Sequence, residues 1–196
     1  MTLGRLLLVL SLPLYVIDQI TKWWVVMRFS DPEPGSNYTR GEAIEVIEGY
    51  FNIVRVHNQG VAFGMGNGTT WAPVVFLIVP FVALGVLAYF HKRGALSTKL
   101  LRVAGALLVT GILGNLTDRL LQGFFLERYA EASFWERLSQ GYVVDFLDFF
   151  IPVVNYRWPS FNVADSCISI AAVLLIISTF REDGVSKSSS EQAASE

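Results

Sequence analysis

Two aspartates, Asp145 and Asp165, stand where a carboxyl group is costly. Asp165 opens the otherwise apolar stretch Ser166 to Phe180, and Asp145 lies in the run Val143-Val144-Asp145-Phe146. An ionisable side chain at membrane depth is rare and marks a functional site with a nearby partner by default. Two carboxyl groups that share a site do not readily both ionise, so one can serve as an acid and the other as a base. The pair therefore predicts water activation and hydrolysis of a peptide bond.

A second interpretation of Asp165 is structural. Asn162 and Asp165 have the spacing of a helix N-cap and an acidic N3 residue, so both could satisfy free N–H groups at a helix start. That explains Asp165 but leaves Asp145 and Asn115 without a role. A dual role is also open, because a cap would fix the direction of the Asp165 carboxylate.

Other hydrolytic chemistries fit the sequence poorly. The chain has two histidines, His57 and His91, which the topology below places on opposite sides of the membrane. No HExxH or GxSxG pattern occurs, so neither a zinc helix nor a Ser-His-Asp set is predicted.

Composition defines the class of protein. The 196 residues are 53% hydrophobic and 16% charged, and mean hydropathy is +0.46, which predicts a single membrane domain. A net charge of -2 without a basic cluster gives no sign of a nucleic-acid partner. The single cysteine, Cys167, excludes an internal disulfide.

Apolar segments predict a mainly α polytopic protein with four transmembrane helices within one domain, residues 1–183. Each helix has the roughly 20 residues that a bilayer requires. The expected spans are about 6–27, 72–90, 103–121 and 161–180.

Three further segments are predicted from their residue patterns. Short β-branched and aromatic runs within about 40–64 predict a small extracytoplasmic sheet of two or three strands. The alternation of aromatic and charged residues over about 123–140 predicts an interfacial amphipathic helix. The Ser-rich residues 184–196 are expected to be a disordered tail, and Asp145 is expected in the loop before the fourth span.

Orientation follows from one short cationic loop. The residues between the second and third spans include His91-Lys92-Arg93, Lys99 and Arg102, with no acid. By the positive-inside rule this loop and both termini are cytoplasmic, and the connections 28–71 and 122–160 lie outside.

This topology gathers polar residues in the outer half of the bilayer. Asp18 and Lys22 are four residues apart and share a helical face, either as a mutual ion pair or facing a polar cavity. Gly111 and Gly114 permit close helix approach next to Asn115. Asp118 and Arg119 follow on the same side, where the alternative is a snorkelling pair at a helix end.

At this point the chain resembles a known family, the lipoprotein signal peptidases (signal peptidase II), which are bacterial membrane aspartic peptidases. The resemblance extends from the first span to the fourth and rests on five motifs in order: Asp18-Gln19-x-x-Lys22, His57-Asn58-x-Gly60-x-Ala62-Phe63, Gly111-x-x-Gly114-Asn115-x-x-Asp118-Arg119, Val143-Val144-Asp145-Phe146 and Phe161-Asn162-x-Ala164-Asp165.

The resemblance implies a site and a reaction. Asp145 and Asp165 would be the catalytic dyad, and the residues that line or support the site would be Asn58, Gly60, Gly111, Asn115, Asp118, Arg119, Asn162, Asp18 and Lys22. Family members need no metal or other cofactor, remove the signal peptide of prolipoproteins before a diacylglyceryl-modified cysteine, and are inhibited by globomycin. They lie in the bacterial inner membrane, with four helices, a periplasmic β-cradle and the active site near the periplasmic face.

Two features depart from the family pattern. Residues 122–140 form a longer connection than is usual, and Val61 stands where alanine is common. Both bear on substrate recognition and neither on the dyad.

Two other functions remain open at this stage. Acids in a helix bundle also mark small proton or ion carriers, although the second span has no polar group to continue such a path. A membrane scaffold would tolerate neutral replacements of the aspartates.

Overall fold

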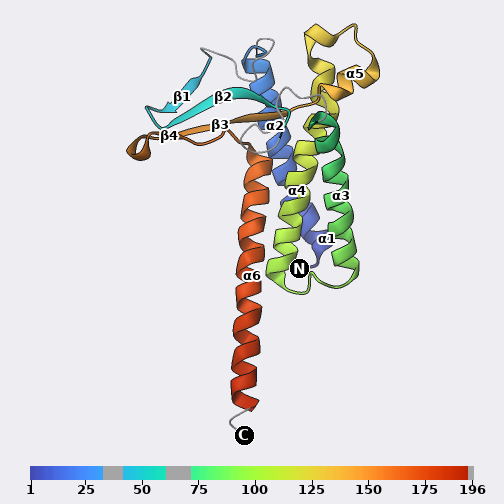
Figure 1. Cartoon of the computed structure of the whole chain (residues 1–196), viewed down its shortest axis with the longest axis vertical. Helices are drawn as coiled ribbons and strands as arrows, with labels where there is room; N and C mark the ends of the chain where they lie inside the picture. The colour runs from blue at the N-terminus through green and yellow to red at the C-terminus, as the bar shows by residue number, and fades with distance from the viewer. Residues whose placement is uncertain (33–41, 61–71, 194–196) are drawn as a thin grey trace.

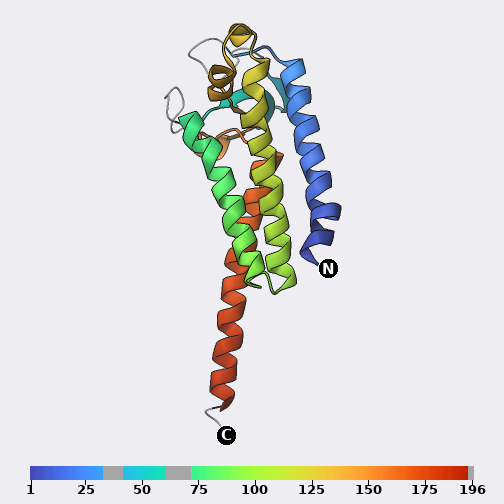
Figure 2. The same cartoon turned by 90° about the vertical axis from the view of Figure 1, so that its right-hand side faces the viewer.

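The computed structural model describes residues 1–32, 42–60 and 72–193, and four of its helices are long and apolar enough to cross a membrane. Figures 1 and 2 show these helices as a bundle, with the strands gathered at one end. The predicted mainly α membrane fold with a small sheet is confirmed. The helices of the bundle are α1 (Leu3–Leu6), η1 (Leu7–Ser11), α2 (Leu12–Arg28), α3 (Ala72–Lys92), α4 (Lys99–Leu121) and α6 (Val163–Ala193).

The first span is one continuous rod made of three pieces. α1 passes through the π-helical turn η1 into α2, so that the apolar stretch runs from Leu3 to Arg28. Its last turn ends where the Phe29 N–H donates to the Val25 carbonyl. The span thus starts a few residues earlier than the sequence predicted.

α4 lies at the centre of the bundle and α3 at its edge. In the apolar part of α4 44% of the residues are buried, whereas none of the residues Val75–Lys92 of α3 is buried. A helix that is apolar all round and exposed all round is suited to lipid contact. α3 is therefore a lipid-facing helix, and α4 carries the polar groups that the bundle encloses.

Close contact between α4 and α6 depends on glycine. A Cβ atom on Gly111 would lie 2.5 Å from the Ala164 carbonyl oxygen and against the Ile168 side chain. One on Gly114 would lie 2.6 Å from Asp18 Oδ2. Only hydrogen fits at these positions, so the predicted close approach at Gly111 and Gly114 is confirmed.

Four strands form one antiparallel sheet in the order β1-β2-β3-β4. β1 (Ile44–Ile47) and β2 (Phe51–Asn58) fall in the region predicted to be β, while residues 33–41 and 61–71 lie outside the described part of the chain. β3 (Val143–Ile151) and β4 (Tyr156–Arg157) come from the connection that was expected to be a loop. The expectation of two or three strands was therefore wrong.

The physical reason is the pattern of β3. Its sequence Val-Val-Asp-Phe-Leu-Asp-Phe-Phe-Ile does not alternate apolar and polar residues, because most of its first six residues are buried on both faces. β3 pairs with β2 across a long sequence separation, with Val56 opposite Asp145 and Asn58 opposite Val143. Asp145 is therefore held on a strand at the bundle end of the sheet.

The segment 122–140 is also different from its prediction. It forms two 3-10 turns, η3 (Gln122–Phe125) and η4 (Glu127–Tyr129), and the short helix α5 (Phe134–Ser139). The Ser133 side chain caps α5, and glycine at position 123 lets the chain fold back against the Arg137 carbonyl. One continuous amphipathic helix was thus the wrong expectation, because local capping and a glycine contact divide the segment.

The end of the chain differs as well. Residues 184–196 were expected to be disordered, but α6 continues to Ala193, and residues 194–196 lie outside the described part. Once a helix is nucleated, each added residue brings one more hydrogen bond without a new nucleation cost. The lysine, glutamate, glutamine and alanine in this tail are good helix formers.

Replacing Gly111 by alanine tests the α4–α6 contact. We expect a loss of about 1–3 kcal/mol in stability, because the new methyl group overlaps the α6 backbone. The measurement is the thermal unfolding temperature in detergent.

Gly85→Ala is the matched control, because a Cβ there meets no atom within 4 Å. It should leave stability unchanged or raise it slightly, since alanine favours a helix over glycine. Equal unfolding temperatures for the two variants would contradict the proposed close packing.

Candidate active site

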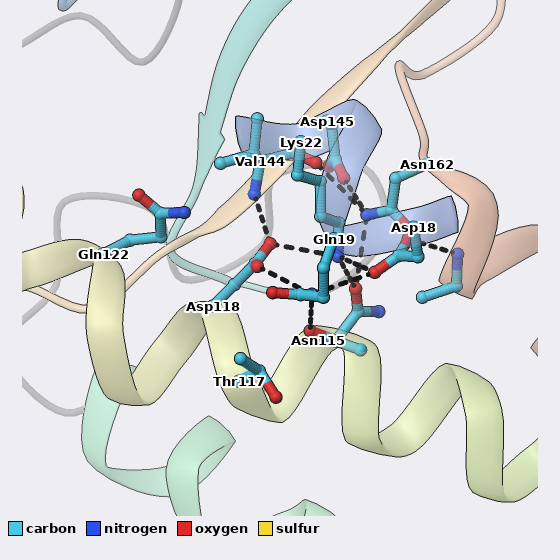
Figure 3. A network of polar contacts seen from close by, with 12 residues as sticks. Asp18, Gln19, Lys22, Asn115, Thr117, Asp118, Gln122, Val144, Asp145 and Asn162 are labelled. Atoms are coloured by element: carbon cyan, nitrogen blue, oxygen red, sulfur yellow. Dashed lines mark hydrogen bonds and ion pairs between the residues drawn. The ribbon is translucent and has the colours of Figure 1, made fainter. Parts of the chain in front are cut away.

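A network of polar side chains lies where α2, α4 and α6 meet the sheet. Figure 3 shows it from close by, with Lys22 between side chains of α2 and α4 and with Asp145 and Asn162 beside it. Most of its members are buried. Buried polar groups must be hydrogen-bonded, so the partners of each can be followed in turn.

Lys22 is the positive centre of the network. Its Nζ atom lies 2.9 Å from Asp18 Oδ2 and 3.0 Å from Asp118 Oδ2, and it donates to Asn115 Oδ1 at 3.0 Å. The Lys22, Asp18 and Asp118 side chains are fully buried. The mutual ion pair predicted from the sequence is confirmed, and it lies among buried polar side chains of α4.

The two carboxylates around Lys22 also hold the backbone next to Asp145 and Asp165. Asp18 Oδ1 accepts from the Ala164 N–H at 2.8 Å, one residue before Asp165. Asp118 Oδ2 accepts from the Val144 N–H at 3.0 Å, one residue before Asp145. A single buried ion cluster thereby positions both chain segments.

Asn162 and Asp165 form a reciprocal cap at the start of α6. The Asp165 N–H donates to Asn162 Oδ1 at 2.9 Å, and the Asn162 N–H donates to Asp165 Oδ2 at 3.2 Å. This is the capping-box arrangement. The capping interpretation from the sequence is therefore correct, and the cap fixes the Asp165 carboxylate as the dual role requires.

The side-chain amide of Asn162 joins the cap to Asp145. Its Nδ2 donates to Asp145 Oδ1 at 2.7 Å and to Asn115 Oδ1 at 3.2 Å. Asn115 in turn donates from Nδ2 to Asp165 Oδ1 at 2.7 Å. The two aspartates, from β3 and α6, are thus linked through Asn162, which contacts both, and a second path runs from Asn162 through Asn115 to Asp165.

Asn58 completes the shell of Asp145 from the end of β2. It donates from Nδ2 to Asp145 Oδ2 at 3.0 Å, and its Oδ1 accepts from the Gly60 N–H at 3.1 Å. The antiparallel register explains this contact, because a diagonal cross-strand neighbour is within reach of a polar side chain.

Burial sets the electrostatics of Asp145, which is 2% exposed. Desolvation, followed by the negative charge of Asp165, raises the pKa of Asp145 well above its usual range. The amide donors of Asn58 and Asn162 oppose that shift in the pKa and do not cancel it. Asp165 is partly exposed, so the pair opens to its surroundings on the α6 side.

Arg119 does not pair with Asp118. Its Nη2 donates to the Gly60 carbonyl at 2.7 Å and Nη1 to the Gln59 carbonyl at 3.3 Å, and its guanidinium carbon lies 5.3 Å from the Phe76 ring centroid. The snorkelling alternative is therefore wrong. Arg119 holds the chain that leaves β2, and Val61 beyond it lies outside the described residues.

Of the predicted site residues, Gly111 alone takes no part in the polar network, because it packs α4 against α6. The sequence-based list omitted Gln19, whose Nε2 donates to Asp18 Oδ2, the Gly114 carbonyl and Asp118 Oδ1 at 3.1 to 3.3 Å. Its position next to Asp18 in the sequence was the signal that could have identified it as a site residue. Ala164 and Val144 contribute through backbone N–H groups, which do not depend on the type of side chain, so the sequence could not identify them.

A separate buried cluster surrounds His57. The His57 ring stacks on Tyr142 with centroids 3.6 Å apart, and its Nε2 accepts from Arg55 Nε at 3.0 Å. Burial, and next the positive charge of Arg55, lowers the pKa of His57 well below its usual value. Burial also raises the pKa of Tyr142 to about 12. His57 is therefore a neutral structural group.

Arg55 in the same cluster joins the sheet to the first span. Its guanidinium donates to the carbonyls of Phe29 and Val26, at 2.8 and 3.2 Å, just at the end of α2, and it pairs with Asp31. A cation there satisfies carbonyls that the helix leaves free. Among the described residues, no group of three His, Cys, Asp or Glu side chains is arranged to hold a metal ion.

The fold and the site together define a polytopic membrane enzyme with a linked pair of carboxylates at one end of its bundle. The family model of signal peptidase (SPase) II matches residues 10–181. This chain belongs to the signal peptidase II family of proteases.

Relatives and solved structures agree with this assignment. The chain is 36% identical to a lipoprotein signal peptidase of Alteromonas mediterranea, over 92% of this chain and 83% of the relative. It is 33% identical to that of Symbiobacterium thermophilum, over 87% and 91% of the two chains. Two bacterial membrane enzyme structures superpose with TM-scores of 0.68 and 0.64, at 28% and 29% identity, covering 90% and 88% of this chain and 88% and 91% of theirs.

Lys22→Met tests the role of the buried ammonium. The change leaves Asp18 and Asp118 buried without a counter-ion, and breaking a buried pair typically costs about 3–5 kcal/mol. We expect a large fall in the unfolding temperature in detergent.

Lys92→Met, at an exposed position near the end of α3, is the control and should behave like the parent protein. Adding Asp118→Asn to Lys22→Met should restore part of the loss, since it removes one of the unpaired carboxylates. A Lys22→Met protein as stable as the parent would show that the cluster does not hold the bundle.

Proposed function

We propose that this protein is the lipoprotein signal peptidase of its organism, with Asp145 and Asp165 as the catalytic dyad. The substrate is a prolipoprotein, which is cut before its diacylglyceryl-modified cysteine. One observation carries the assignment of the dyad: Asn162 caps α6 with Asp165 and donates to Asp145, so both carboxyl groups are oriented by the same residue.

The two aspartates take different parts. Asp145 is the more deeply buried member, which favours its neutral form, so it holds the proton and donates it to the substrate carbonyl oxygen. Asp165 lies in the first turn of α6, where the helix dipole stabilises a negative charge. It takes a proton from water while the water oxygen forms a bond to the carbonyl carbon. Asp165 then passes that proton to the leaving nitrogen as the C–N bond breaks, and Asp145 recovers its proton from the hydroxyl group that becomes a carbonyl again.

The amides around the dyad keep the carboxyl oxygens in place. Asn58 and Asn162 bind the oxygens of Asp145, while Asn115 binds Asp165. A site whose donors are fixed before the substrate arrives needs little reorganisation during the reaction. Arg119 supports this arrangement from outside by holding the carbonyls of Gln59 and Gly60.

The proposed orientation places the dyad near the periplasmic face of the bacterial inner membrane, with both termini in the cytoplasm. Figure 1 supports it, because the N-terminus, the far end of α6 and the cationic loop before α4 lie away from the sheet. The substrate's acyl chains would then remain in the outer leaflet while its signal segment reaches the dyad between the helices. Globomycin is the expected inhibitor at this site.

The alternative of a proton or ion carrier finds no support in the described residues. Hydroxyl groups deeper in the bundle donate to backbone carbonyls: Ser11 and Thr110 both donate to the Ala106 carbonyl, at 2.7 and 3.0 Å. They do not extend the line of acids toward the cytoplasmic side.

Asp145→Asn and Asp165→Asn should each reduce cleavage of a lipidated precursor peptide by several orders of magnitude. An amide can neither hold the exchangeable proton nor accept one from water, whereas its shape preserves the packing. The measurement is product formation in detergent, with circular dichroism to confirm the fold.

Asp148→Asn is the matched control on the same strand. Asp148 is also buried, but its partners are Arg157 and Asn52 at the far side of the sheet. It should retain cleavage. Near-normal turnover by either dyad variant would refute the assignment and leave the scaffold interpretation standing.

The raised pKa of Asp145 also predicts how stability depends on pH. A carboxyl group whose pKa is higher in the folded than in the unfolded protein stabilises the fold while it is protonated. This contribution is fully present below the ordinary aspartate pKa of about 4, and it is lost as the pH rises through the raised pKa. The unfolding temperature should therefore fall over this window, and Asp145→Asn should flatten the profile.

The Asp165→Asn variant tests whether the charge of Asp165 contributes to this pH dependence. Since the charge of Asp165 contributes to the raised pKa of Asp145, its removal should move the fall in stability to lower pH. An unchanged profile in Asp165→Asn, together with a flattened one in Asp145→Asn, would show that Asp145 titrates independently of its neighbour. An unchanged profile in Asp145→Asn would show that Asp145 does not cause the pH dependence.

A further inference from the structure

The hairpin that ends the sheet exposes apolar side chains at its tip. Val153 is 92% exposed and Val154 is 66% exposed, the first the highest value of any large apolar residue in the described chain. They lie in the 3-10 turn η5 (Pro152–Val154), between β3 and β4. Exposed apolar residues that gather at one tip, rather than singly, mark an interaction surface.

Aromatic residues flank the same tip. Tyr156 and Trp158 are 42% and 50% exposed, and Ile151 adds a further apolar side chain. Tyrosine and tryptophan are favoured at the level of lipid headgroups, because their rings are apolar and their polar atoms remain in contact with water. The composition of the hairpin is therefore that of an interfacial membrane anchor.

The hairpin is rigid, so its apolar side chains cannot retract into the fold. Asn155 adopts the left-handed conformation that the turn requires, with φ 48°, and its N–H donates to the Pro152 carbonyl at 3.1 Å. The buried carboxylate of Asp148 pairs with Arg157 on β4, and the Trp158 N–H donates to the Phe149 carbonyl at 2.8 Å. Proline, turn and ion pair together hold the tip outward.

The bundle fixes where this tip must lie. Trp158 precedes the first residue of α6 by only a few positions, so the hairpin leaves the bundle at the level where the fourth span begins. Figure 1 shows the hairpin projecting sideways from the top of α6, and its tip lies no further from the bundle's mid-level than the strands themselves. With the four spans in the bilayer, this places the tip at the membrane surface on the side of the sheet, which is the outer surface in the orientation proposed above.

We propose that the Ile151–Trp158 hairpin inserts its tip into the outer leaflet and anchors the sheet to lipid. Val153 and Val154 would lie among the upper parts of the acyl chains, and Tyr156 and Trp158 at the headgroups. Because β3 carries Asp145 near one end and this tip at the other, the anchor fixes the strand at both ends. The hairpin is thereby continuous with the lipid-facing surface of the spans.

The other edge of the same sheet provides the comparison. β1 is the opposite edge strand, and its Val46 is 49% exposed. Ile47 on this strand and Tyr50 just after it are exposed as well, but in Figure 1 β1 lies further from the bundle's mid-level than the Ile151–Trp158 hairpin. Val46 is thus the matched position: an exposed valine on the same sheet that the proposal leaves in water.

Depth can be measured with single-cysteine variants. Val153→Cys and Val46→Cys, each made with Cys167→Ala to remove the native thiol, would carry an environment-sensitive fluorophore. The labelled full-length proteins would be reconstituted into vesicles of phosphatidylethanolamine and phosphatidylglycerol that contain a spin label near the glycerol end of the acyl chain. A probe in the leaflet should emit at shorter wavelength and be quenched by the spin-labelled lipid.

We expect strong lipid quenching and a blue shift at position 153, with quenching by aqueous iodide at position 46 instead. Iodide quenching of the probe at position 153 without lipid quenching would overturn the proposal. Equal lipid quenching at both positions would also overturn it, because the whole sheet would then rest on the membrane. Quenching that appears at position 153 only when precursor peptide is added would assign the tip to the substrate. The readout needs no catalysis, so its result is independent of the proposed function.

Discussion

The structure depends on how it balances one buried positive charge. An ammonium group removed from water must be surrounded by compensating charges and acceptors, or the bundle cannot close. Around Lys22 these are the carboxylates of Asp18 and Asp118, from two different spans, and an asparagine oxygen. Each carboxylate also accepts a backbone N–H from the residue immediately before Asp165 or Asp145. The same interaction that allows α2 and α4 to pack therefore sets the positions of β3 and the start of α6.

Close packing of α4 and α6 is the second constraint, and it works together with the first. Without side chains at Gly111 and Gly114, α4 approaches the first turn of α6 closely enough for Asn115 to reach Asp165. Lipid offers no hydrophobic drive for helix association, so the contact must come from close packing and from polar bonds between helices. At this junction the small residues supply the packing, and the amide supplies the bond.

The sequence predicted what depends on local pattern and failed where partners are distant or lack side-chain chemistry. The four spans follow from length and hydropathy, and the pairing of Asp18 with Lys22 follows from helical spacing. The capping arrangement at Asn162 could also be predicted. β3 could not, because a strand buried on both faces has no alternation and finds its partner β2 far away in the chain. The backbone donors at Val144 and Ala164 were invisible for a different reason, since any residue carries the same N–H.

Asn162 shows that one residue can cap a helix and also contact a carboxyl group of the candidate site. Its Oδ1 accepts the N–H of Asp165 as a helix cap, and its Nδ2 donates to Asp145. Serine would cap the helix as well, but its shorter side chain has no amide to donate to the second carboxyl group, and aspartate would add a negative charge and no donor. A cap contributes about 1 kcal/mol, and a hydrogen bond between neutral groups contributes a similar amount. Asparagine is thus favoured because one side chain combines the acceptor that starts α6 with the donor that orients Asp145.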